Sequence, residues 1–362
     1  MPSKITFASC HPRELRDDAT LPALLDKMLA GWGFQKRFKG KSVAVKMHLG
    51  GGIGYSTIHP FLVGRIVAAV KTAGGRPFIT DTPGAIGPAR QRGYTAEVLG
   101  CPIVAVAGQA DKYVYPKRVG FRTLKTVNLA GAIVDADAMM VLSHGKGHGH
   151  CGFGGAIKNL AMGCVDGDTR GQIHRLMSAT FVVNPDKCKG CMLCRDNCPN
   201  GAISYKNGKI EIFDHHCKYC MHCQLACPTK AITIDQSGYR YFQKGMALTT
   251  REVLRTFKPA DVFFITALLS ITPVCDCWGF TTPSLVPDIG IVAGDDLVAI
   301  ETAALDLIKA EHYIEGSLPP PFRLSGSGHL FQRIHGKDPY MQVQECEKLH
   351  LGSRKYKLVE VR

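Results

Sequence analysis

The sequence of 362 residues has no long hydrophobic run. Its longest largely apolar stretch, from Val262 to Ile271, is far short of the roughly 20 residues that cross a bilayer. The first residues, Met1 to Lys4, also lack the apolar stretch of a signal peptide. We therefore expect a cytoplasmic protein that has no membrane partner.

Two other patterns are missing. The glycine run from Gly50 to Gly54 is not G-x-G-x-x-G and has no acidic residue about 20 positions later, so a nicotinamide dinucleotide site is not expected. The run is either an anion-binding turn or a turn without a ligand. Acids are scarce, with 30 Asp and Glu against 44 Lys and Arg. The chain has no recognisable RNA-binding module or interleaved aromatic residues, so nucleic acid is not an expected partner despite this basic charge.

Cysteine, in contrast, is abundant. In a long chain without a signal peptide, 15 cysteines indicate metal ligation or catalysis rather than disulfides. Eight of them form two C-x2-C-x2-C-x3-C-P runs, which consist of Cys188, Cys191, Cys194 and Cys198, and of Cys217, Cys220, Cys223 and Cys227. This spacing predicts two [4Fe-4S] clusters, with the fourth cysteine of each run binding the other cluster. Zinc ribbons use paired C-x2-C motifs, which makes two zinc sites the weaker alternative.

The cysteine block resembles bacterial two-cluster ferredoxins, which implies a relay for single electrons. Residues 181–237 contain seven Lys or Arg and five acids, whereas free ferredoxins of this kind are usually acidic. This balance favours an internal relay that receives electrons from an acidic partner, such as a ferredoxin or flavodoxin. The alternative is that the lysines only balance the charge of the clusters.

Strand-like and helical segments alternate on both sides of the block, which predicts an α/β fold with a largely parallel sheet. The expected strands are Lys4–Ser9, Ser42–His48, Arg76–Asp81, Ile103–Val106, Ala138–Ser143, Val262–Leu268 and Ile289–Val292. The expected helices begin near Thr20 and span Pro60–Ala73, Thr250–Thr256 and Asp295–Ala310. Neither flank alone resembles a complete sheet. We predict one α/β domain, residues 1–180 and 239–362, interrupted by a small α+β, ferredoxin-like two-[4Fe-4S] insertion at 181–238.

Candidate site residues follow the predicted strands. A loop rich in Gly, His and Lys begins at His144 and leads into a helix, which places it at the carboxyl edge of the sheet, where α/β proteins form their sites. The alternative for any one of these histidines is a solvated loop position. Cys275 and Cys277 are so close that a disulfide between them is strained, which indicates a metal site or a redox dithiol.

Four strings resemble the family named domain of unknown function 362, and they lie at residues 147–164, 275–278, 287–290 and 352–356. The resemblance implies one continuous fold from about residue 40 to the C-terminus, but it supplies no reaction. It also implies a shared site that includes Lys146, His148, Lys158, Asn159, Cys164, His174, Cys275, Cys277 and Asp288.

We predict that the clusters pass electrons to this site. Its predicted catalytic residues are Lys146, His148, Lys158, Asn159, His174 and Asp276. Cys164, Cys275 and Cys277 are expected to converge on a third [4Fe-4S] cluster or another metal, and the lysines to hold a small anionic substrate. The chain is then a ferredoxin-coupled iron-sulfur oxidoreductase. The alternative is a non-enzymatic electron carrier or metal-handling protein.

Overall fold

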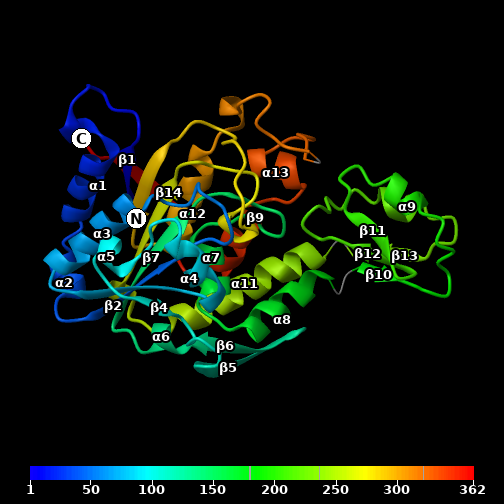
Figure 1. Ribbon diagram of the computed structural model, residues 1–362, viewed down its shortest axis with the longest axis horizontal. Helices are drawn as coiled ribbons and strands as arrows, with labels where there is room; N and C mark the ends of the chain where they lie inside the picture. Colours follow the sequence, from blue (N-terminus) through cyan, green and yellow to red (C-terminus); the bar gives the residue numbers. More distant parts are fainter. Residues whose placement is uncertain (179–180, 236, 321) are drawn as a thin grey trace.

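The computed structural model describes residues 1–178, 181–235, 237–320 and 322–362 of the chain. An eight-stranded sheet forms the centre of the molecule. The strand order is β16-β1-β15-β14-β7-β2-β3-β4 (Figure 1). These strands are β1 (Ser3–Ser9), β2 (Ser42–Met47), β3 (Arg76–Asp81), β4 (Ile103–Ala105), β7 (Ala138–His144), β14 (Val262–Leu268), β15 (Gly290–Gly294) and β16 (Tyr356–Glu360). β15 runs antiparallel to β1 and β14, and the other neighbouring pairs are parallel. The predicted α/β fold with a largely parallel sheet is confirmed.

Helices cover both faces of the sheet, because successive residues of the central strands are apolar on both sides. Met139 and Val141 of β7 pack into one apolar core, while Met140 and Leu142 pack into the other. The helices in the second core are α1 (Leu21–Ala30), α2 (Phe34–Phe38), α3 (Pro60–Thr72), α4 (Pro83–Arg90) and α5 (Ala96–Leu99). Those in the first core are α6 (Gly131–Val134), α7 (Ala156–Gly163), α8 (Gly167–Ser178), α11 (Gly238–Leu254), α12 (Leu297–Leu307), α13 (Leu330–His335) and α14 (Met341–Lys348).

The ends of these helices follow local sequence signals. The ring of His59 accepts a hydrogen bond from the Phe61 amide at the start of α3, and Gly74 follows the helix with a φ of 79°. Asp296 caps α12 by accepting a hydrogen bond from the Ala299 amide. The structure also contains short 3-10 helices, which are η1 (Asp17–Ala19), η2 (Pro259–Asp261), η3 (Asp276–Trp278) and η4 (Ala310–His312).

Helix α11 is much longer than the expected segment Thr250–Thr256. Its first half contains glycine, which weakens the helical signal in the sequence. In the structure, a Cβ on Gly245 would lie 2.2 Å from Cδ1 of Leu176 in α8. Glycine at this position therefore allows α8 and α11 to pack closely, and packing overrides the low helix propensity.

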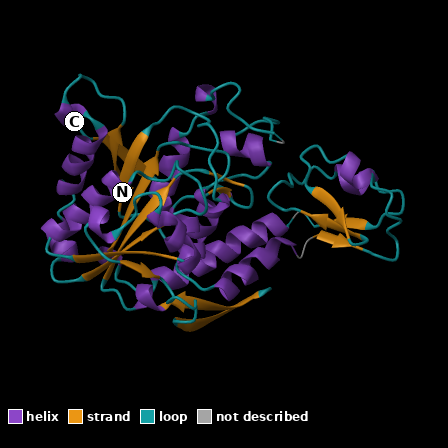
Figure 2. Cartoon of the chain, in the orientation of Figure 1, coloured by secondary structure: helices purple, strands orange, loops and turns teal. Residues whose placement is uncertain are grey.

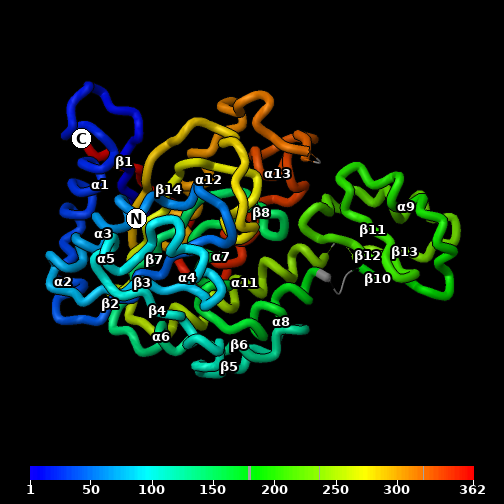
Figure 3. The backbone as a smooth tube through the Cα atoms, viewed as in Figure 1, coloured from blue at the N-terminus to red at the C-terminus, as the bar shows by residue number. Residues whose placement is uncertain are grey.

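Small antiparallel sheets surround the central one. They are formed by β5 (Val114–Phe121) with β6 (Leu124–Ala130), by β8 (Gly147–His148) with β9 (Gly152–Phe153), and by two pairs in the cysteine-rich segment, residues 181–235. The two chain ends lie on the side of the body away from this segment (Figure 3). In the residues that the structure describes, no helix combines the length and apolar character needed to cross a membrane.

The cysteine-rich segment forms a separate small body at the ends of α8 and α11 (Figure 2). Its elements are β10 (Phe181–Val183), α9 (Leu193–Asp196), β11 (Ile203–Lys206), β12 (Lys209–Ile212), α10 (His222–Leu225) and β13 (Ile232–Ile234). Phe181 pairs with Ile234, so the chain enters and leaves the segment at neighbouring points. Strands from before and after it pair in the central sheet. The domain bounds at 181 and 238 stay a prediction.

Candidate functional site

A cavity of about 240 Å³ lies at the carboxyl edge of β2, β3, β7 and β14. Parallel strands bring their carboxyl ends to one edge, and the residues there come from distant parts of the chain. The cavity lining includes Lys46, His48, Asp81, His144, His148, Lys158, Asn159, Arg170, His174, His215, Cys275, Asp276 and Cys277.

A buried ion pair forms the part of the cavity next to β2 and β3. Lys46 donates from Nζ to Oδ1 of Asp81 at 3.0 Å and to Oδ1 of Asn159 at 2.8 Å. Asp81 also lies 3.1 Å from Nδ1 of His48. Burial opposes ionisation of Asp81, but the charge of Lys46 and the hydrogen bond with His48 hold its pKa well below the ordinary value. Asp81 is therefore a carboxylate, and it orients His48 toward the cavity.

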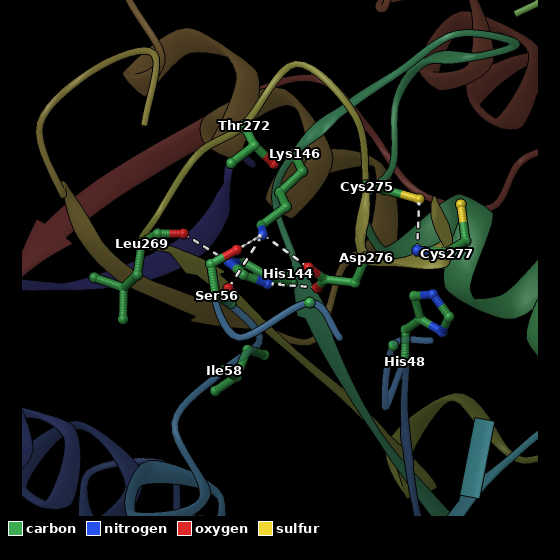
Figure 4. Close-up of polar contacts among 12 residues, drawn as sticks. His48, Ser56, Ile58, His144, Lys146, Leu269, Thr272, Cys275, Asp276 and Cys277 are labelled. Carbon is green, nitrogen blue, oxygen red and sulfur yellow. Dashed lines mark hydrogen bonds and ion pairs between the residues drawn. The ribbon is translucent and has the colours of Figure 1, made fainter. Parts of the chain in front are cut away.

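A second network surrounds Asp276 (Figure 4). Its Oδ1 accepts a hydrogen bond from Nζ of Lys146 at 2.7 Å, and its Oδ2 lies 2.8 Å from Nδ1 of His144. Lys146 also donates to Oγ of Ser56 at 2.8 Å. Burial opposes the charge of Asp276, but His144 and Lys146 keep its pKa well below the ordinary value. These contacts fix the loop that carries the two neighbouring cysteines.

Cys275 and Cys277 lie on this loop with unequal thiols. Nζ of Lys158 lies 3.1 Å from Sγ of Cys275, and Cys275 is buried while Cys277 is exposed. Burial opposes the Cys275 thiolate, but the hydrogen bond from Cys277 and the charge of Lys158 hold its pKa well below the ordinary value. The same hydrogen bond raises the pKa of Cys277. The pair is therefore a thiolate beside a thiol.

His48 completes a possible metal-binding group with these two cysteines. The ligand atoms of His48, Cys275 and Cys277 all lie within 4.8 Å of one another. Figure 4 shows the three side chains side by side, with His48 coming from the end of β2. Cysteine and histidine are ligands for zinc and iron. The three positions can hold a single metal ion at the cavity wall.

The glycine run supports this loop. The Gly51 amide donates to the Asp276 carbonyl oxygen at 3.1 Å, and the Ile53 amide donates to that of Gly279 at 2.7 Å. A Cβ on Gly52 would lie 2.5 Å from the Gly279 oxygen, so only glycine permits this contact. Of the two interpretations of the run, these contacts favour the turn without a ligand.

Four histidines form a further group where the cysteine-rich segment meets the body. One nitrogen from each ring of His148, His150 and His215 lies within 4.8 Å of those of the other two. The His174 ring lies 4.8 Å from that of His150. Burial lowers the pKa of His148, His150 and His215, and lowers that of His174 to about 4. The imidazoles are therefore neutral at pH 7, which is the form that binds metals.

Most of the predicted site residues are gathered at the cavity. His148, Lys158, Asn159, His174, Cys275, Asp276 and Cys277 line it, and Lys146 contacts it through Asp276. Asp288 is exposed outside it and accepts from the Ser270 amide at 2.5 Å.

Cys164 does not join Cys275 and Cys277 in either possible metal-binding group of the described residues. It lies at the C-terminal end of α7, where burial raises the pKa of its thiol to about 12 and Lys46 and Asp81 are its charged neighbours. The expected convergence of Cys164 with this pair stays a prediction, and His48 is the residue whose ligand atom lies beside the two cysteines.

Several site residues were not expected from the sequence. Lys46, His48 and Asp81 lie within or directly after predicted strands, and a lysine inside the apolar run of β2 was the available signal. The sequence indicates His144 only as the start of a loop. No sequence signal identifies His215 as a site residue, because its position depends on how the cysteine-rich segment contacts the body.

The two cysteine runs have the same backbone conformation. Gly190 and Tyr219 have φ values of 64° and 56°, and Met192 and Met221, two positions later, have values of 61° and 65°. The amides of Ala202 and Ala231 lie 3.2 Å from Sγ of Cys198 and Cys227, the last cysteines of each run. Left-handed residues of this kind occur in backbone turns that bind anions and Fe–S clusters.

The charges on the thiols also group the cysteines across the two runs. Burial raises the pKa of Cys194, and the thiolates of Cys191 and Cys227 raise it further. Burial raises the pKa of Cys223 to about 11, with contributions from Cys217, Cys198 and Cys220. Cys227, the last cysteine of the second run, is thus a charged neighbour of Cys194 in the first run, and Cys198 is one of Cys223 in the second.

Comparisons with known proteins give a family and two distant structures. A family model described as "Domain of unknown function (DUF362)" matches residues 43–306. No curated protein matches the chain. The lactate racemase apoprotein from Thermoanaerobacterium thermosaccharolyticum is similar over 74% of this chain, with 10% identity and a TM-score of 0.30. A crystal structure of a Thermotoga maritima protein is similar over 70%, with 11% identity and a TM-score of 0.35. The chain spans about half the length of these two proteins, 51% and 52%.

Proposed function

Because the chain belongs to the DUF362 family, whose description gives no reaction, we propose from the site that this is an iron-sulfur redox protein. In this proposal the cysteine-rich segment relays electrons to a single iron ion held by His48, Cys275 and Cys277. An acidic ferredoxin or flavodoxin donates the electrons, and a small anionic substrate in the cavity accepts them. The observation that carries the proposal is a contact between the two cysteine sites.

That contact is made by Trp278. The residue follows Cys277, and its ring lies parallel to that of His216, with an interplanar angle of 3° and centroids 6.2 Å apart. His216 in turn precedes Cys217, a cysteine of the second run. Trp278 also contacts His215, with ring centroids 5.0 Å apart. Two aromatic rings thus bridge the cavity pair and the cysteine-rich segment.

The residues of the segment fit the [4Fe-4S] clusters that the sequence predicts. The repeated left-handed residues, the amide contacts to Cys198 and Cys227 and the crossed grouping of the thiols are what two clusters need. When bound, such clusters supply single electrons at low potential. Cys188, Cys191, Cys194 and Cys227 would hold one cluster, and Cys217, Cys220, Cys223 and Cys198 the other.

Three cations line the cavity, and each has an anionic partner. Lys46 pairs with Asp81, Arg170 with Asp111, and Lys158 with the Cys275 thiolate. A metal ion bound to this thiolate would take over its charge and leave Lys158 for an anionic substrate. Lys158 lies at the metal-binding thiolate, so it can hold the substrate beside the ion.

An anaerobic metal and sulfide analysis tests the proposal. The intact protein should contain about eight sulfides and about nine irons per chain, since two clusters account for eight of each. Cys275→Ser combined with Cys277→Ser should remove one iron and no sulfide. Full-occupancy zinc in the cysteine-rich segment, with no sulfide, would refute the relay.

Electron delivery needs a separate test on the same protein. After reduction by a low-potential donor, a substrate should speed reoxidation of the clusters, and Trp278→Leu should slow it by about tenfold or more. Trp278→Phe, which keeps an aromatic ring, is the matched control and should retain most of the rate. Equal rates in the Leu and Phe variants contradict the path through Trp278.

A metal-handling protein is the second candidate, and the exposure of Cys277 favours it. An exposed thiol beside a thiolate can pass a metal ion to another protein by ligand exchange. Such a protein would show no substrate-dependent reoxidation and would transfer the metal at His48, Cys275 and Cys277 to a chelator within minutes.

A further inference from the structure

A second group of possible metal ligands, His148, His150 and His215, lies where the cysteine-rich segment contacts the body. His148 ends β8 and His150 lies in the turn after it, both buried, while His215 lies between the two cysteine runs. Their rings are close, with centroids of His150 and His215 3.8 Å apart and those of His148 and His215 5.3 Å apart. Three imidazoles from two distant parts of the chain thus meet at one point.

Two of these rings have a buried nitrogen without a partner. Nδ1 of His150 and Nδ1 of His215 are inaccessible to solvent and make no hydrogen bond. Such atoms are rare in native proteins, because an unpaired buried polar group costs about 1–3 kcal/mol. A metal ion between the rings would satisfy both.

The surroundings of His150 and His148 select the nitrogen that each can offer. Oδ2 of Asp214 lies 3.6 Å from Nε2 of His150, which leaves Nδ1 for a metal in the usual carboxylate–histidine–metal order. Nδ1 of His148 accepts from the His150 amide at 3.1 Å, which leaves its Nε2. That ring also hydrogen-bonds Cys275, so metal binding would exchange this contact for a coordinate bond.

Lys337 fixes the two parts of the chain that carry the histidines. Its Nζ donates to the Gly149 carbonyl oxygen and, at 2.8 Å, to that of Asp214. A Cβ on Gly149 would lie 2.6 Å from the His215 oxygen, so the loop packs directly against the segment. The Asp214 carboxylate offsets the repulsion between Lys337 and a bound cation.

We propose that His148, His150 and His215 form a site for a first-row divalent metal ion such as Zn²⁺, with an open position toward the cavity. Neutral imidazoles suit zinc, iron, copper and nickel, and three protein ligands with one open position are typical of catalytic zinc. His148 and His215 line the cavity, so the open position faces the space beside Lys158. The ion also joins the cysteine-rich segment to the body. This site goes beyond the proposed function and does not depend on it.

Zinc binding to the full, cluster-loaded chain tests the proposal. The parent carries Cys275→Ser and Cys277→Ser, so that the cysteine pair binds no zinc. After treatment with EDTA and addition of Zn²⁺, it should bind one zinc per chain. His215→Ala should weaken binding by about 100-fold or more, and Asp214→Asn by about tenfold. His216→Ala, which changes the adjacent histidine, is the matched control and should bind within about threefold of the parent.

X-ray absorption at the zinc edge gives a readout that does not depend on whether a variant folds. The parent should show only nitrogen and oxygen ligands, at about 2.0–2.1 Å. Sulfur ligands, no zinc in the parent, or equal affinities in the His215→Ala and His216→Ala variants would overturn the proposal. The outcome is separate from the electron relay, which is judged by iron, sulfide and reoxidation.

Discussion

Lys46 and Asn159 hold each other by two hydrogen bonds, one in each direction. Nζ of Lys46 donates to Oδ1 of Asn159 at 2.8 Å, and Nδ2 of Asn159 donates to the Lys46 carbonyl oxygen at 3.2 Å. This exchange ties β2, which leads to His48, to α7, which carries Lys158. The two sides of the cavity are therefore positioned by one pair of residues.

Lys46→Met should destabilise the protein strongly. It leaves the Asp81 carboxylate, whose side chain is 2% exposed, without its main cation, and loss of one partner of a buried ion pair costs about 3–5 kcal/mol. Urea unfolding measures the loss. Lys41→Met breaks the more exposed pair with Asp261 and should cost about 1 kcal/mol or less. Similar losses in the two variants would contradict the buried pair.

Glu301→Gln should remove a pH dependence of stability. Glu301 accepts from the Ala156 amide at 2.6 Å at the start of α7, and burial raises its pKa from 4.5 to about 7. The unfolded chain loses this proton at lower pH than the folded chain does, so stability falls as pH rises from about 4.5 to about 7 and then levels off. The total change is about 3 kcal/mol.

Thermal unfolding between pH 5 and pH 8 measures this slope. It should be shallower in Glu301→Gln than in the wild-type protein, while Glu311→Gln, a change at an exposed position, should keep it. If Glu301→Gln keeps the wild-type slope, the proton responsible for the pH dependence belongs to another group.

Lys158→Met should make Cys275 less reactive. The variant removes the cation that helps to hold the Cys275 pKa low, so less thiolate is present at pH 7. The rate of Cys275 alkylation by iodoacetamide, followed by mass spectrometry in metal-depleted protein, should fall by about tenfold or more. Lys158→Arg keeps the charge and should react nearly as fast as the wild type. An unchanged alkylation rate in the Met variant would show that Lys158 does not hold the Cys275 pKa low.

The crossed grouping of the cysteines predicts which substitutions act together. In a parent with Cys191→Ser and Cys194→Ser, which lacks the first cluster, Cys227→Ser should remove no further iron. Cys198→Ser in the same parent should remove about four irons per chain, because it belongs to the remaining cluster. An anaerobic iron analysis measures both losses. If Cys227→Ser removes about four irons per chain in this parent and Cys198→Ser removes none, each run binds its own cluster.

Local signals explain which parts of the structure could be predicted. The strands Arg76–Asp81 and Val262–Leu268 were expected with the observed bounds, because their apolar runs are bordered by turns. Cys275 and Cys277 could be assigned to a site because they are neighbours in sequence. The segment predicted for α11 was too short, because Gly245 weakens the helical signal in the sequence. Only the contact of Gly245 with α8 explains why a glycine lies within this helix.

The remainder of the site depends on tertiary structure. His48 follows β2 and Asp81 is the last residue of β3, so the two meet only when β2 and β3 pair and no spacing in the sequence links them. Cys164 was grouped with the cysteine pair because it follows a predicted element, but the end of α7 places it beside Lys46 and Asp81. His215 becomes a site residue only through the contact between the cysteine-rich segment and the body.

The single antiparallel strand of the central sheet has a consequence for how this protein can diversify. Leu268 and Gly290 are directly paired, so the loop that holds Cys275 and Cys277 leaves and rejoins the sheet at one place. Loops joined in this way tolerate insertion and replacement far better than the strands that they connect. Recombination or engineering can therefore replace the two cysteines together with their loop, while His48, Lys158 and the strand order and register stay in place.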